Sequence, residues 1–162
     1  MIRSIVICAT VLAACPHALA APIERHANPP PSIILDSVTI PAGAEILMLS
    51  GQVADPIDPA STDSLAAYGD TRTQTVSTLR KIEAALARQG YAMSDVVKLT
   101  VFLVAHPGED GRMDFAGFNA GYREFFGTQT NPNLVARSTV QVAGLAGPHY
   151  LIEIEAVAAK VR

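Results

Sequence analysis

An arginine and two glutamates stand out near the C-terminus, within the stretch LVARSTVQVAGLAGPHYLIEIEAVAAK (134–160). The stretch predicts two β-strands joined by a Gly-Pro turn, with Arg137 in the first strand and Glu153 and Glu155 on one face of the second. A guanidinium can hold a carboxylate through two parallel hydrogen bonds, and a carboxylate can transfer protons. The same residue types also form cross-strand surface pairs that contribute little to stability. Whether these residues form a catalytic site or only surface pairs decides whether the chain is an enzyme.

Alternation along each strand predicts which groups share a face of the sheet. Arg137 is expected on the same face as Thr139 and Gln141, opposite a row that packs on the core. That core row is Ser138, Val140, Val142 and Gly144, and its partner across the turn is Ile152, Ile154 and Ala156. Glu153 and Glu155 then lie with Arg137 on a polar face, and the helices cover the other face.

Pairing within this expected hairpin limits any site that uses both charges. Symmetric pairing about Gly147 places Arg137 and Glu153 about four residues apart along the sheet, or roughly 13 Å. A shared site therefore requires a shifted register, a bulge or residues from two chains.

Three earlier segments predict the strands that accompany this pair. Residues 32–40 and 45–51 are β-rich and are joined by Pro-Ala-Gly-Ala, which predicts an opening hairpin. Residues 95–104 are β-branched and almost continuously apolar, as expected of a central strand buried on both faces.

Two helices are predicted between these strands. Thr71 and Gln74 match a capping box, and the apolar stripe that follows ends at Gly90. Aromatic residues mark the buried side of the second helix, which stops at Gly127. They are Phe115, Phe118, Tyr122, Phe125 and Phe126. The predicted order is β-β-α-β-α-β-β, an α+β sheet with two helices on one face.

The N-terminus has the features of an export signal. Residues 1–20 combine Arg3, a short apolar run and Ala-Leu-Ala before Ala21, which predicts a secretory signal and a periplasmic protein. A second interpretation is a lipoprotein signal, because Leu-Ala-Ala precedes Cys15, where a lipid anchor would be attached. Residues 21–31 end in three prolines and predict an extended tether, followed by one domain at 32–162.

Composition excludes several classes of site. Both cysteines lie in the signal, so the mature chain has no thiol or disulfide. Removing Arg3 with the signal takes the formal net charge from −3 to −4, which does not favour nucleic-acid partners. His26, His106 and His149 lack ligand spacing, so we expect no metal site.

Five motifs occur in the order SGQ (50–52), VVKLTVFL, DFAGFNAGYREFF, ARSTVQVAGL and IEIEAVA. In this order the chain resembles the RidA (YjgF/UK114) family across nearly all of residues 32–160, as a divergent exported member. The resemblance implies a chorismate-mutase-like fold and a homotrimer with three sites in the clefts between subunits. It also implies cofactor-free hydrolysis of reactive enamines and imines, such as 2-aminoacrylate, to 2-keto acids and ammonia.

The resemblance assigns roles to five residues. Arg137 would hold the carboxylate of an imino or keto acid, a task in which lysine cannot imitate the planar guanidinium. Glu153 would position water and pass protons to the imine nitrogen. Backbone amides at Gly51 and Thr139 would help to hold the acid, and Asn119 would line the pocket.

Some positions depart from the family pattern and leave the substrate open. Family deaminases carry Gly-Pro-Tyr-Ser-Gln where this chain has PPPSIILDSV, without a tyrosine, and Pro-Ala-Arg is here Val135-Ala136-Arg137. The AHPGEDGR loop (105–112) is longer than usual. The alternative function is therefore a non-catalytic binder of small carboxylic acids or a chaperone-like trimer. Endoribonuclease activity, also ascribed to the family, is disfavoured by the acidic charge and the absence of a basic stripe with interleaved aromatic residues.

Overall fold

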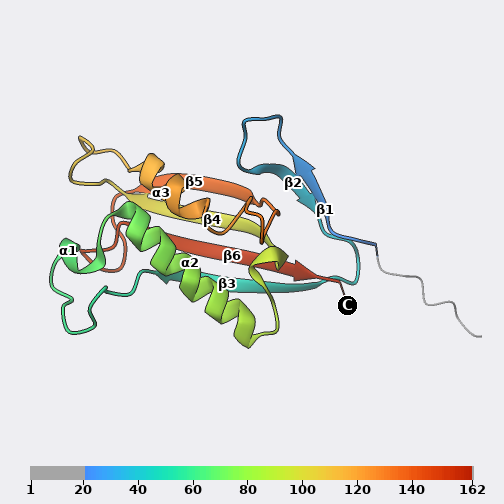
Figure 1. Ribbon diagram of the computed structural model, residues 1–162, viewed down its shortest axis with the longest axis horizontal. Coiled ribbons are helices and arrows are strands. Elements are labelled where there is room, and N and C mark those ends of the chain that lie inside the picture. The colour runs from blue at the N-terminus through green and yellow to red at the C-terminus, as the bar shows by residue number, and fades with distance from the viewer. Residues whose placement is uncertain (1–20, 162) are drawn as a thin grey trace, which may run out of the picture.

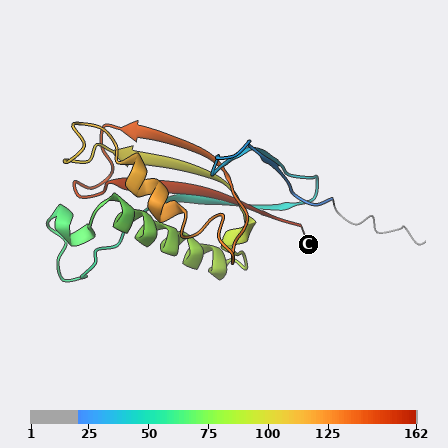
Figure 2. The ribbon, with the colours of Figure 1, turned by 45° about the horizontal axis from the view of Figure 1, so that its top comes forward.

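The computed structural model describes residues 21–161, so the predicted signal and Cys15 lie outside the described residues. A six-stranded mixed sheet carries the two longer helices on one face (Figures 1 and 2). The strands are β1 (Glu24–Ala27), β2 (Leu35–Thr39), β3 (Glu45–Val53), β4 (Val96–Val104), β5 (Ala136–Val142) and β6 (Ile152–Lys160). The helices are α1 (Leu65–Tyr68), α2 (Thr71–Arg88), the short 3-10 helix η1 (Met93–Asp95) and α3 (Phe115–Tyr122). Within residues 21–161, no helix has the length and apolar character needed to cross a membrane.

The strands pair differently from the prediction. Their order in the sheet is β1-β2-β5-β4-β6-β3, so both expected hairpins are wrong. β4 lies between β5 and β6, parallel to the first and antiparallel to the second. β2 and β3 lie apart, since β2 pairs with β1 and β5 while β3 pairs with β6 at the far edge. The strongly apolar β4 takes a central place because a strand with neighbours on both sides buries the most surface.

The expected faces of β5 are also reversed. Arg137 lies beside Leu99, which in turn pairs with Ala156, and both of these apolar residues are buried under the helices. Cross-strand neighbours share a face, so Arg137 and Thr139 face the helices. Val140 lies on the open face of the sheet and is 45% exposed. Alternation separates two sets of side chains, but it does not show which set is inside.

Residues on the open face of β4 are only half-buried, so this strand is not covered on both faces as predicted. The helix side of the strand is fully buried, whereas the alternate positions Lys98, Thr100, Phe102 and Val104 retain exposure. The hydrophobic core therefore lies between the sheet and the helices α2 and α3. Its largest members are Leu79, Ile82, Leu86, Leu99, Leu103, Phe118, Tyr122, Phe126, Ile152 and Ile154.

Helix α2 begins at a different cap from the predicted one. The side chain of Asp70 accepts a hydrogen bond of 2.8 Å from the backbone N–H of Thr73 and is the N-cap. Gln74, expected in a capping box, is instead fully buried. Its amide nitrogen donates to the backbone carbonyls of Gly69 and His149, and its carbonyl accepts from the N–H of Leu151. One buried side chain thus joins the start of α2 to the loop before β6.

The segment predicted as a tether contains a strand. Residues 24–27 form β1, which pairs antiparallel with β2. This pair extends the sheet beyond β5, but the register of β2 with β5 consists of the single pair Leu35 and Ala136. The outer edge of β5 is therefore unpaired from Arg137 to Val142 among residues 21–161.

Candidate functional site

Arg137 is enclosed by one face of helix α3. Its guanidinium carbon lies 4.6 Å from the ring centre of Tyr122, 4.7 Å from that of Phe118 and 5.8 Å from that of Phe115. Its Nη2 donates a hydrogen bond of 2.9 Å to Oδ1 of Asn119. Positions 115, 118, 119 and 122 follow the spacing that places side chains on one side of a helix. Helix α3 therefore holds the guanidinium by stacking and by one directed hydrogen bond.

The Arg137 site retains hydrogen-bonding capacity that the protein does not use. The Nη1 atom of Arg137 is buried and has no hydrogen-bond partner among residues 21–161, and the same is true of Oγ1 of Thr139, two residues along β5. Burial lowers the pKa of Arg137, and proximity to Tyr122 opposes that shift, but an arginine stays protonated in proteins. A half-buried cation with an unused donor is suited to bind an anion.

Glu153 and Gly51 form a second cluster. β3 has a bulge between Leu49 and Gln52, so its pairing with β6 shifts at Ser50 and Gly51. Glu153 lies over the bulge, and a β-carbon on Gly51 would lie only 2.7 Å from its carboxyl carbon. Glycine at position 51 therefore leaves the space that the Glu153 carboxylate occupies.

The two clusters lie on opposite faces of one sheet. Arg137, with Asn119 and Thr139, is on the helix side, whereas Glu153 pairs with Phe102 on the open side. Arg137 aligns with Leu99 of β4, three residues from Phe102, and β4 separates the two strands. Within a single chain, Arg137, Asn119 and Thr139 form one cluster. Gly51 and Glu153 form another, and the two clusters lie apart.

Sequence reasoning missed the part of Phe118 and Tyr122 in the Arg137 site. Both were assigned only to the hydrophobic core, where they do lie. The usable signal was the spacing of Tyr122 from both Phe118 and Asn119, because residues three or four positions apart lie on the same side of a helix.

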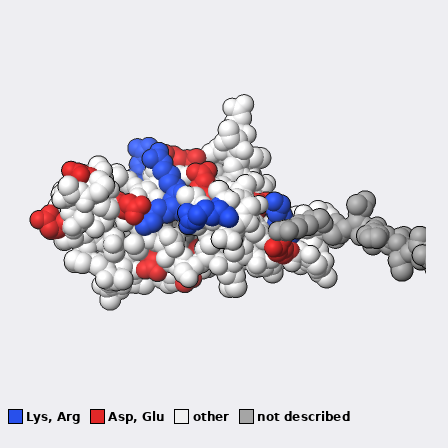
Figure 3. Space-filling model, turned by 90° about the horizontal axis from the view of Figure 1, so that it is seen from below, with Lys and Arg blue, Asp and Glu red and all other residues white. Residues whose placement is uncertain are grey.

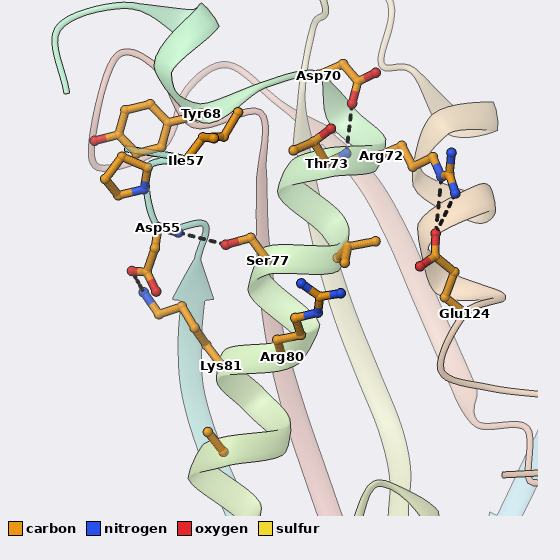
Figure 4. Close-up of a pocket in the computed structure, with 13 residues that line it drawn as sticks. Asp55, Ile57, Tyr68, Asp70, Arg72, Thr73, Ser77, Arg80, Lys81 and Glu124 are labelled. Atoms are coloured by element: carbon orange, nitrogen blue, oxygen red, sulfur yellow. Dashed lines mark hydrogen bonds and ion pairs between the residues drawn. The ribbon is translucent and has the colours of Figure 1, made fainter. Parts of the chain in front are cut away.

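A separate groove of about 650 Å³ runs along the outer side of α2 (Figure 4). Ion pairs form at two places in it, Lys81 with Asp55 at 2.7 Å and Arg72 with Glu124 at 2.8 Å. No residue predicted for the site lines this groove. On the face seen from below, basic side chains gather in a short group bordered by acidic ones (Figure 3). Within residues 21–161, no group of His, Cys, Asp and Glu is arranged to hold a metal ion.

Comparison with known proteins gives one consistent result. A family model described as Endoribonuclease L-PSP matches residues 38–160. A RutC family protein of Pyrococcus horikoshii is 39% identical over 133 residues, which cover 82% of this chain and 93% of the relative. The 2-iminobutanoate/2-iminopropanoate deaminase of Salmonella typhimurium is 36% identical over 115 residues, which cover 71% of this chain and 80% of the relative.

A solved structure agrees with these relatives. YyfB of Yersinia pestis, described as a member of the conserved Rid protein family, is 26% identical and superposes with a TM-score of 0.63. The superposition covers 84% of this chain and 98% of that one. The expected chorismate-mutase-like α+β fold is thereby confirmed.

Proposed function

Because this chain belongs to the endoribonuclease L-PSP (YjgF/RidA) family, we propose that it hydrolyses imines of small 2-keto acids. The observation that carries the proposal is the buried Nη1 of Arg137, which has no partner among residues 21–161. It lies beside aromatic rings and close to a second unpartnered polar atom, Oγ1 of Thr139. Relatives named for 2-iminobutanoate and 2-iminopropanoate supply the substrate class.

The proposed reaction divides the substrate between the two clusters. Arg137 holds the carboxylate through charge-assisted hydrogen bonds, while the backbone amides of Thr139 and Gly51 help to hold the acid. Water adds to the imine carbon, a carbon–oxygen bond forms, and the carbon–nitrogen bond breaks to release ammonia and the 2-keto acid. Glu153 passes the first proton of water to the nitrogen as the C–O bond forms, and then passes the proton of the resulting hydroxyl to the nitrogen as the C–N bond breaks.

The placement of the clusters supports a site shared between two copies of the chain. Arg137 and Glu153 lie on opposite faces of the sheet, so neither face alone offers both groups. The open face also carries large apolar side chains, with Met48 76% exposed and Ile46 52% exposed. Such a face is suited to burial against another copy, and we propose the homotrimer of the family resemblance as the active form.

The test is ammonia release from imino acids formed in situ by an amino-acid oxidase. Wild-type protein is compared with Arg137→Ala and Glu153→Ala. Acceleration by the wild type that disappears in both variants supports the proposal. If folded protein that binds ligand does not accelerate ammonia release from imino acids with several kinds of side chain, the proposal is contradicted.

The second candidate is a non-catalytic binder of small carboxylic acids. The observation that favours it is the lack of a tyrosine in the segment around β2, where residues 30–39 contain none. The nearby Tyr122 does not replace it as a free acid, because its hydroxyl donates to the carbonyl of Ile33. This function predicts binding that depends on Arg137 and no change of rate in Glu153→Ala.

We also propose that the protein is exported, with a lipid anchor at Cys15 as the alternative. The N-terminus of the protein isolated from its host distinguishes the two. A mature chain that begins at Ala21 supports cleavage of a secretory signal, whereas one that begins at a modified Cys15 supports the anchor.

A further inference from the structure

An arginine in the segment before the family match makes several hydrogen bonds to the rest of the molecule. Arg25 of β1 lies upstream of residue 38, where the family model begins. Its Nη1 donates to the backbone carbonyls of Val96 and Leu134, each at 2.9 Å, and its Nη2 donates to the carbonyl of Ser94 at 2.9 Å. One side chain of β1 thereby holds two other parts of the backbone, the start of β4 and the segment that leads into β5.

These bonds are made in a partly buried place. Burial lowers the pKa of Arg25, an effect that proximity to Asp95 and Tyr122 opposes. Asn133 reinforces the same junction, since its side-chain amide donates to the carbonyl of Ser94 at 3.0 Å. Hydrogen bonds from a charged donor to buried carbonyls are stronger than those between neutral groups.

Residues 24–35 form an arm that contacts the three residues immediately before Arg137. Arg25 binds the carbonyl of Leu134. The N–H of Leu35 donates to the carbonyl of Val135 at 3.0 Å, and Leu35 pairs with Ala136. Three consecutive residues immediately before Arg137 are therefore held by the arm.

The arm also contacts the ring on which the guanidinium stacks. The hydroxyl of Tyr122 donates to the carbonyl of Ile33 at 3.2 Å. The chain between α3 and β5 contains no helix or strand, so the approach to Arg137 is fixed by its pairing with β4 on one side and by contacts with the arm on the other. Both the backbone that carries Arg137 and the ring beneath it are tied to the same arm.

We propose that Arg25 is a positioning residue for Arg137: through the carbonyl of Leu134 it sets where the guanidinium lies over Phe118 and Tyr122, and hence how tightly a carboxylate is held. The proposal rests on the proposed function insofar as Arg137 is the carboxylate-binding group. A displacement of about 1 Å in such a group is sufficient to weaken a binding or catalytic geometry severely.

The test uses Arg25→Met, which keeps an unbranched apolar stem and removes all the donors, and Arg25→Lys, which keeps the charge but cannot serve three carbonyls in a fixed fork. The matched control is His26→Ala on the same strand. The side chain of His26 is exposed; among residues 21–161 it forms a hydrogen bond with Thr39 and lies 4.0 Å from Glu24, both within the β1–β2 pair.

The first measurement needs no ligand and no activity. The ¹⁵N-labelled guanidinium of Arg137, identified by its loss in Arg137→Lys, reports its place over the two rings through ring-current shifts. Arg25→Met is expected to move and broaden this signal, Arg25→Lys to move it less, and His26→Ala to leave it in place. Should Arg25→Met fail to fold, Arg25→Lys provides the same comparison in folded protein.

The second measurement is the affinity for 2-oxobutanoate, the keto acid that hydrolysis of 2-iminobutanoate yields. Arg25→Met is expected to raise Kd and KM about tenfold while kcat changes by less than about twofold. A variant that only lowers the melting temperature, with the Arg137 signal and Kd as in the wild type, overturns the proposal. If the wild type neither binds the acid nor hydrolyses imines, the proposed function fails, and the signal in the unliganded protein still decides whether Arg25 positions Arg137.

Discussion

The carboxylate of Glu153 occupies the space beside Gly51 that a β-carbon would fill. The bulge in β3 brings the backbone of Gly51 close to β6 at this point, so the backbone and the acid lie in contact. The Glu153 carboxylate, the proposed proton-transfer group, can therefore lie here because Gly51 on the neighbouring strand has no side chain.

Gly51→Ala is expected to displace Glu153 and to lower kcat for imine hydrolysis at least about tenfold, because proton transfer depends on the placement of the acid. Steady-state ammonia release measures the effect. Gly144→Ala is the matched control, since a β-carbon there meets nothing within 4 Å. An unchanged kcat in Gly51→Ala would show that Glu153 need not lie where the structure places it.

Arg137→Lys is expected to weaken binding of 2-oxobutanoate about 10-fold to 100-fold, the range for loss of hydrogen bonds to a charged group. A lysine offers a compact ammonium, which neither forms two parallel hydrogen bonds nor stacks as a plane over the rings of Phe118 and Tyr122. Titration calorimetry measures Kd. Arg80→Lys, on the outer side of α2, is the control and should bind as the wild type does. Equal affinity in Arg137→Lys would exclude bidentate binding.

Mixing two inactive variants tests whether a site uses two chains. Arg137→Ala and Glu153→Gln, refolded together, are expected to regain up to roughly a quarter of the wild-type sites, because random pairing in a cyclic oligomer restores both residues at that fraction of interfaces. Ammonia release is compared with that of each variant refolded alone. Folded mixed oligomers without recovered activity would argue that Arg137 and Glu153 act from one chain or not at all.

Gln74→Leu is expected to lower the free energy of unfolding by about 2–4 kcal/mol, since buried backbone groups at Gly69, His149 and Leu151 lose their partner. Urea denaturation measures the change. Arg80→Ala, at an exposed position, should shift it by less than about 0.5 kcal/mol. A Gln74→Leu variant as stable as the wild type would mean that the loop before β6 finds other partners.

Asp70 is expected to make the stability of the fold depend on pH. The hydrogen bond from the backbone N–H of Thr73 holds the pKa of this carboxylate below its ordinary value, so the stability that it contributes is complete above the unfolded pKa and is lost as pH falls through the folded one. Thermal melts between neutral pH and pH values below about 4 are expected to show wild type losing its advantage over Asp70→Asn, which caps the helix without titrating. Asp70→Ser should behave as Asp70→Asn does. A constant difference across that pH range would contradict this role.

The sequence was sufficient to predict the main strands and helices. The apolar run of β4 and the alternating residues of β6 satisfy local patterns, and so does the stripe of α2. Pairing could not be read in the same way. Residues 134–160 have the form of a hairpin, but β4 buries more surface by lying between β5 and β6. The strand β1 was missed because its four residues, Glu-Arg-His-Ala, carry no apolar pattern.

The site residues named from the sequence remain predictions, but their placement on the sheet differs from the expectation. Arg137 looked like a surface residue because a charged group on a strand is most often solvated, whereas here the rings of Phe118 and Tyr122 and the amide of Asn119 enclose it. Glu153 was placed correctly on the polar side of β6. The error in the face of Arg137 therefore changes the proposed site from one surface of a sheet to two surfaces that must meet.

The pairing of β3 with β6 joins Glu45 near the beginning of the domain to Lys160 at its end. Strand β3 is thus made long before β6, with which it pairs among the described strands, and such long-range closure slows folding. Until β6 inserts, both β3 and β4 present unpaired edges that other chains can join. We therefore expect a chain released before Ile152 to aggregate through these edges instead of folding as a smaller protein.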